Sequence, residues 1–159
     1  MKKNKIVKAF FAGMFALVLF LTATAAEAFQ ATLVQTPYGG DVNVEKINTT
    51  RSVVYAWAES WAQKNIQAYM AYYSPNFKSG KLNYKQWREK KALVFQRPGA
   101  ISIKISDLWV FVEGRTATAS FIQTYRDAKH ADIGEKVLKF EQVGDRWQII
   151  SEKWTPLKG

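Results

Sequence analysis

The chain has 159 residues, with 23 lysines and arginines against 13 acidic residues, and 48% of its residues are apolar. This length and apolar content suit one folded domain. The sequence has no cysteine and a single histidine, which excludes disulfides, thiol nucleophiles, iron–sulfur clusters and metal sites that need two histidines. We therefore expect neither a bound metal nor a cofactor.

Residues 1–28 have the features of a secretory signal peptide. A lysine-rich start precedes an uncharged apolar run over 9–21, and the stretch 26–28 (Ala-Glu-Ala) places small residues where a signal peptidase cleaves; 23–25 (Ala-Thr-Ala) is a second candidate. As a helix, the apolar run would cover roughly 20 Å, which is short of the roughly 30 Å hydrocarbon core of a bilayer. We expect an exported protein, periplasmic or secreted, with no stable membrane span after cleavage.

Residues 29–44 form the next segment. They contain Pro37, Gly39 and Gly40 and show no sustained periodicity, so we expect an extended arm or linker. The folded domain is then predicted over 45–159.

The domain is predicted to begin with a helix. Its apolar residues, which include Trp57 and Trp61, recur at helical spacing along one stripe. Asn48, Thr49 and Thr50 are the candidate N-caps.

Two further helices are predicted before any long strand. A shift in the apolar stripe indicates a kink or a second helix capped by Asn65, which Pro75 ends, and the polar segment 77–83 fits a small hairpin or loop. A third helix starts at Tyr84 and stops before Pro98.

From residue 100 the hydrophobic period changes from 3.6 to 2. Four strands are predicted, over 101–112, 116–125, 136–143 and 146–154. Because short connections join them, we expect an antiparallel meander. Helices that precede an antiparallel sheet define an α+β domain, with three N-terminal helices packed on a curved sheet of about four main strands.

Three polar residues of the predicted strands are candidates for a pocket. Gln123 and Tyr125 share the face of Phe121, which we expect to be buried. If Glu152 also points inward, aromatic surroundings would raise the pKa of its carboxyl group and make it a candidate general acid or base. The alternatives are an internal hydrogen-bonded pair for Gln123 and Tyr125, and an ion pair or a solvated position for Glu152.

Aromatic residues of the helical segments could line the mouth of the same cavity, although such stripes are more often plain core. The full candidate set for ligand binding is Gln123, Tyr125, Glu152, Trp57, Tyr69 and Tyr73. We expect His130 to be a solvated loop residue.

Several spaced motifs together resemble a known family. They are the run Asn65–Phe77, the third helix with Trp87, and the segments 121–125, 136–139 and 147–152. Over about residues 46–155 the chain resembles the nuclear transport factor 2-like superfamily (NTF2-like, SnoaL-like), and within it the small bacterial domains found beside peptidoglycan L,D-transpeptidase and carboxypeptidase modules. The resemblance implies a cone-shaped fold with a cavity between sheet and helices, often as a homodimer.

The function expected from this resemblance is a non-catalytic, exported binding module that uses its cavity and basic surface. Catalytic members similar to ketosteroid isomerase and scytalone dehydratase carry Asp or His residues in the cavity, and no such set matches here. The alternative is a small lyase or isomerase with Glu152 as the proton-transfer base and Tyr125 and Gln123 stabilising an enolate-like oxygen. Expected partners are a small ligand, an envelope protein or an anionic glycan, because the formal net charge is +10. Nucleic acid is not expected, because the protein is predicted to be exported. A basic surface that serves solubility alone is the other reading of that charge.

Overall fold

The computed structural model describes residues 40–157, so the predicted signal peptide and most of the predicted arm lie outside the described residues. Helix α2 spans Gly40–Ala62, and residues 40–44, expected in the arm, are therefore helical. The predicted cap is wrong, since Asn48, Thr49 and Thr50 lie inside this helix. The hydroxyl groups of Thr49 and Thr50 donate to backbone carbonyls one turn earlier, a bond that lets these residues sit within a helix.

Helix α3 spans Ile66–Ala71, and the predicted cap is confirmed: the side chain of Asn65 accepts a hydrogen bond from the backbone N–H of Ala68 at 3.0 Å. The helix ends earlier than predicted, because strand β1 already begins at Tyr73 and spans Tyr73–Ser79. The pairing of β1 is irregular between Tyr73 and Lys78, around Pro75, which has no amide hydrogen to donate.

The predicted hairpin and third helix are confirmed. Strand β2 (Leu82–Asn83) pairs antiparallel with β1, and helix α4 spans Tyr84–Phe95. The side chains of Asn83 and Gln86 each accept a hydrogen bond from the other residue's backbone N–H at 3.0 Å, which fixes the start of α4.

Four long strands form the predicted antiparallel meander: β3 (Ser102–Glu113), β4 (Thr116–Arg126), β5 (Ala131–Val143) and β6 (Arg146–Pro156). Strand β1 adds to β6 in parallel, so the sheet has six strands in the order β2-β1-β6-β5-β4-β3. The expectation of about four strands under three comparable helices is corrected to six strands with one long helix, α2, and two shorter ones. The polar sequence of β1 hides its pairing with β6, which depends on a partner some 70 residues away in the chain.

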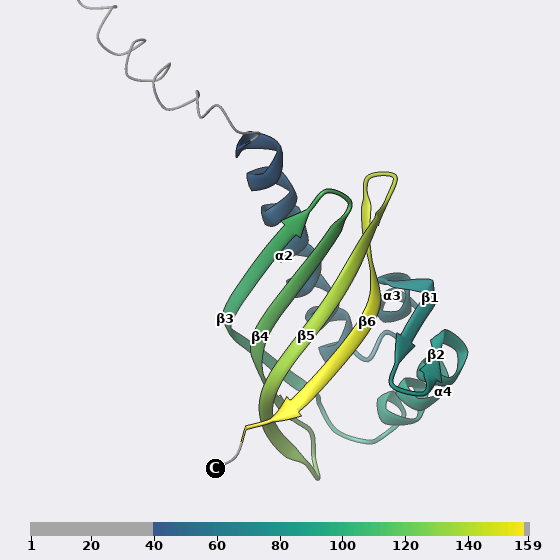
Figure 1. The fold of residues 1–159 in the computed structure, drawn as a ribbon. Helices are drawn as coiled ribbons and strands as arrows, with labels where there is room; N and C mark the ends of the chain where they lie inside the picture. The colour runs from purple at the N-terminus through teal and green to yellow at the C-terminus, as the bar shows by residue number, and fades with distance from the viewer. Residues whose placement is uncertain (1–39, 158–159) are drawn as a thin grey trace, which may run out of the picture. The chain divides into compact units, whose positions relative to one another are not determined.

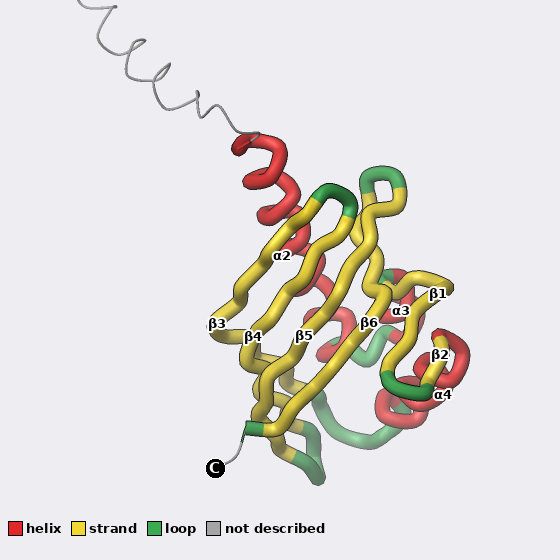
Figure 2. The backbone as a smooth tube through the Cα atoms, viewed as in Figure 1, coloured by secondary structure: helices red, strands yellow, loops and turns green. Residues whose placement is uncertain are grey.

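The helices lie on one face of the twisted sheet, as Figures 1 and 2 show. The core forms between these layers, and its largest fully buried side chains include Trp57, Tyr69, Phe121 and Phe140. None of the helices in the described part of the chain is long and apolar enough to span a membrane.

A β-bulge in β6 decides which side chains face the helices. Phe140 pairs with Ile149 and the preceding Lys139 pairs with Ser151, which leaves Ile150 as the extra residue. Such an insertion reverses the inward and outward alternation of a strand. Ile149 before the bulge and Glu152 after it are therefore both buried, although they are three residues apart.

Candidate functional site

Aromatic rings fill the deep interior of the domain. Trp57 and Tyr69 have no exposed surface and Tyr73 has 2%. The ring centroids of Trp57 and Tyr69 lie 6.0 Å apart, and those of Tyr69 and Tyr73 lie 5.0 Å apart. These three residues, predicted to contact a ligand, are packed against one another.

The same rings hold a buried polar network around Glu152. The ammonium group of Lys136 donates to Oε1 of Glu152, and the hydroxyl of Tyr73 donates to Oε2 at 2.7 Å. The indole N–H of Trp57 donates to the Tyr73 hydroxyl at 2.8 Å, and the hydroxyl oxygens of Tyr69 and Tyr73 share a hydrogen bond of 2.5 Å. Both oxygens of Glu152 therefore have partners inside the protein.

The network sets the charge state of Glu152. Burial alone would raise the pKa of its carboxyl group, but the ammonium groups of Lys136 and Lys91 and the hydrogen bonds from Lys136 and Tyr73 outweigh burial and lower that pKa. The inward orientation considered from the sequence is confirmed, and the expected rise in pKa is wrong. Burial and the nearby negative charge of Glu152 raise the pKa of Tyr69 and Tyr73, which keeps both phenols protonated.

A pocket of about 430 Å³ opens beside this network, between α4, the end of α2 and strands β4 to β6. Its walls include two indoles, two lysines and two of the predicted ligand-binding residues: Trp61, Trp87, Lys91, Lys136, Gln123 and Tyr125. Glu152 is not among the residues that line the pocket, whereas its ion-pair partner Lys136 is.

Lys91 is the unusual residue of this pocket. It is 7% exposed, and its Nζ atom lies 3.6 Å from the ring centroid of Trp61 and 4.8 Å from that of Trp87. Among the described residues it has neither an ion-pair partner nor a hydrogen-bond acceptor. Burial lowers the pKa of Lys91 to about 7, against the opposing attraction of Glu152.

Three buried polar atoms at the pocket walls have no hydrogen-bond partner in the described part of the chain. They are the indole nitrogens of Trp61 and Trp87 and Oε1 of Gln123. Most buried polar atoms in folded proteins are paired, so ordered water or a ligand in the pocket would supply the partners of these three atoms.

Tyr125 lies at the rim of the pocket. Its hydroxyl donates to Oδ2 of Asp127 at 2.7 Å, and the same carboxylate lies 3.7 Å from the guanidinium of Arg97. Burial, and then the bond to Asp127, raise the pKa of the Tyr125 phenol. His130 is exposed, as expected, with its ring 3.3 Å from Asp127. This rim ties the end of α4 to the loop between β4 and β5.

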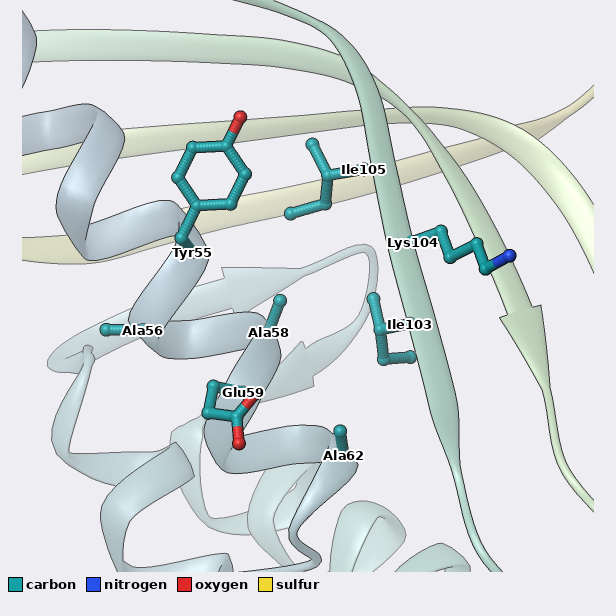
Figure 3. Close-up of a pocket in the computed structure, with 8 residues that line it drawn as sticks. All are labelled: Tyr55, Ala56, Ala58, Glu59, Ala62, Ile103, Lys104 and Ile105. Atoms are coloured by element: carbon teal, nitrogen blue, oxygen red, sulfur yellow. The ribbon is translucent and has the colours of Figure 1, made fainter.

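A second hollow of about 680 Å³ lies between α2 and the edge strand β3 (Figure 3). Tyr55 and Ile105 face each other across it, and Lys104 points away from the helix. None of the described residues that line it has a buried polar atom without a partner. No group of three or more His, Asp or Glu side chains that could hold a metal ion occurs among the described residues. The pocket beside Lys91 is therefore the better candidate site.

The sequence did not identify the two lysines as site residues. Lys136 alternates with Leu138 and Phe140 on the inward face of β5, and Lys91 follows Trp87 by one helical turn on α4. A charged residue in phase with buried apolar residues was the signal that could have identified both.

The sequence of residues 49–153 matches the family of Cds6 C-terminal NTF2-like domains. No curated protein matches the chain. Among solved structures, Bd1075 of Bdellovibrio bacteriovorus is similar with 27% identity and a TM-score of 0.66, over 69% of this chain and 40% of that one. The helical cell shape determining protein Pgp2 of Campylobacter jejuni, as its K307A mutant, has 21% identity and a TM-score of 0.58, over 64% of this chain and 38% of that one. A suggested dehydratase of the NTF2-like family from Streptomyces avermitilis has 13% identity and a TM-score of 0.65, over 72% of this chain and 98% of that one.

Proposed function

Because the chain belongs to the family of Cds6 C-terminal NTF2-like domains, we propose that it is an exported binding module that takes up a small ligand in the pocket beside Lys91. The observation that carries this proposal is the contrast between two buried charges. Glu152 has a partner at each oxygen, whereas the ammonium of Lys91 has none among the described residues and faces an open pocket. A buried charge without a partner is costly in a folded protein, and a ligand can remove that cost.

The alternative, an isomerase or lyase with Glu152 as base, has weaker support. A general base should reach the substrate and have a pKa near the working pH. Glu152 is hydrogen-bonded to Lys136 and does not line the pocket, and the pKa of its carboxyl group is lowered rather than raised. Tyr125 is held by Asp127, so it does not offer a free hydroxyl to an oxyanion. The likeness to a suggested dehydratase at 13% identity shows the fold alone.

A role at the cell envelope is the second part of the proposal. It is supported by the predicted signal peptide and by the excess of basic residues. The chain spans 40% of the length of Bd1075 and 38% of that of Pgp2, so the activities of those longer proteins are not assigned to it. We propose that the module binds an envelope component and supplies no catalysis of its own.

A ligand screen by thermal shift tests the proposal, followed by pull-down from envelope extracts with the tagged mature protein. Val94→Phe places an aromatic ring at the pocket wall in place of a smaller aliphatic side chain. Leu93→Phe is the matched control, because Leu93 is 67% exposed and lies outside the pocket. We expect a compound or an envelope component that binds the wild type and Leu93→Phe but not Val94→Phe. If neither a compound nor a partner distinguishes the two variants, the pocket is not the binding site.

A further inference from the structure

The pocket beside Lys91 holds more buried positive than negative charge. Lys91, Lys136 and Glu152 are each at most 7% exposed, and Glu152 forms its ion pair with Lys136. Lys91 is therefore a second buried cation for which the described residues provide no anion. Removal of one partner from a buried pair is strongly unfavourable, so a buried site of this kind favours a ligand that brings the missing charge.

The charged and titratable groups around Lys91 come from several elements. The negative charge of Glu152 on β6 favours the protonated form of Lys91, and so does Asp132 on β5, whereas Lys136 on β5 and Lys90 on α4 oppose it. Tyr69 on α3 lies with its ring 5.5 Å from Nζ of Lys91 and stays a neutral phenol. At the outer wall the pocket also meets the side chains of Arg97, Tyr125 and His130. Lysine and arginine outnumber acidic residues in this wall, which attracts an anion into it.

The remaining walls show what the rest of the ligand should be. The rings of Trp61, Trp87 and Trp154 line the pocket, and flat or ring-shaped molecules pack well on such faces. The indole N–H of Trp61 and Oε1 of Gln123 have no partner among the described residues, which suits a ligand with several oxygen atoms. A volume of about 430 Å³ limits that ligand to a small molecule.

We infer that the ligand of this pocket is a small ring-bearing organic acid whose carboxylate or phosphate pairs with the ammonium of Lys91 while its ring packs on the indoles. This inference rests on the proposed function and specifies the ligand class. The anion replaces the missing partner of Lys91. Oε1 of Gln123 would accept a hydrogen bond from a hydroxyl group of the same ligand.

Matched probes test the inference by titration calorimetry with the mature protein. Benzoate is compared with benzyl alcohol, glucuronate with glucose, and inorganic phosphate is measured alone. We expect at least one acid to bind about tenfold or more tightly than its neutral analogue, which corresponds to about 1.4 kcal/mol. Displacement of the acid by phosphate would assign the site to phosphate groups, and benzoate or glucuronate binding without phosphate competition would assign it to carboxylates. Equal affinity for acids and neutral analogues would overturn the inference.

Two variants and a pH series locate the charge. Lys91→Met keeps the length and apolar stem of the side chain and should abolish the preference for acids. Lys85→Met is the control, because Lys85 is exposed on the same helix and does not line the pocket. In the wild type, the affinity for the acid should be highest below pH 7 and fall up to tenfold per pH unit above it, since Lys91 then loses its proton before the ligand arrives. The pH series uses the wild type, so it tests the inference even if Lys91→Met does not fold.

The outcomes separate the two proposals. A neutral ring compound that binds to the wild type but not to Val94→Phe would support the proposed binding module and refute the inference that its ligand is an acid. An acid preference that persists unchanged in Lys91→Met, or an affinity independent of pH between 6 and 9, would also refute it. Failure of every compound and envelope extract to bind would instead refute the proposed function itself.

Discussion

Replacement of Lys136 by methionine measures how strongly the buried network depends on its cation. The substitution leaves the carboxylate of Glu152, whose side chain is 2% exposed, with the Tyr73 hydroxyl as its remaining partner among the described residues. Loss of one member of a buried ion pair costs about 3–5 kcal/mol. With a urea dependence of about 2 kcal/mol per molar for a protein of this size, the midpoint of unfolding should fall by roughly 2 M.

Urea unfolding followed by tryptophan fluorescence is the assay. Lys139→Met is the matched control, because Lys139 lies on the same strand but is exposed, and it should change the midpoint little. The double variant Lys136→Met with Glu152→Gln removes both charges and should recover at least half of the loss. Unfolding of Lys136→Met at the same urea concentration as Lys139→Met would contradict this dependence, and so would a double variant that is no more stable than Lys136→Met.

Three further predictions follow from the structure and a fourth from the sequence. The pKa of Glu152 is below its usual 4.5, so its contribution to stability is present above pH 4.5 and is lost as the pH falls further; unfolding midpoints between pH 3 and 6 should change less in Glu152→Gln. The pKa of Lys91 is about 7 in the folded protein against 10.5 for an exposed lysine, so the unfolded chain binds this proton more tightly, and wild-type stability should rise from pH 7 to 9.5 relative to Lys91→Met. Gly134→Ala would place a methyl group 2.5 Å from a carbonyl oxygen of β6 and should cost about 1–3 kcal/mol in urea unfolding, whereas a wild-type midpoint would show that β6 moves freely. Expression in a bacterial host should give a periplasmic protein whose N-terminal sequence starts at Phe29, after cleavage at Ala28, and a full-length cytosolic chain would contradict the predicted signal peptide.

Local signals in the sequence predicted much of the fold. Asn65 caps α3 because its side chain can accept from a backbone N–H that has no helical partner, and this requires only nearby residues. The meander follows from alternating residues and short turns in the same way. The pairing of β1 with β6 was missed, because Pro75 and polar neighbours give β1 no strand pattern and its partner is distant in the chain. The early start of α2 was missed because Gly40 and the residues before it have the composition of a linker.

The site was less predictable than the fold. The burial of Gln123 and Tyr125 followed from alternation along β4, and the structure confirms it. The direction of Glu152 could not follow from alternation, because one inserted residue, Ile150, reverses the pattern in the middle of β6. The direction of its pKa shift depends on Lys136, which lies on the neighbouring strand β5. Neither the spacing of residues nor the composition predicts how close the two side chains come.

The two buried lysines show why charge alone does not mark a binding site. Lys136 and Lys91 both line the pocket and both lie within the influence of Glu152, yet a single carboxylate can neutralise one of them. Lys136 forms the hydrogen-bonded pair, which is then part of the core and should be insensitive to ligands. Lys91 has an indole ring instead of an anion beside it, and a ring stabilises an ammonium less than a carboxylate does in a buried site. The unequal division of one negative charge between two cations therefore separates a structural lysine from one whose partner must come from outside the chain.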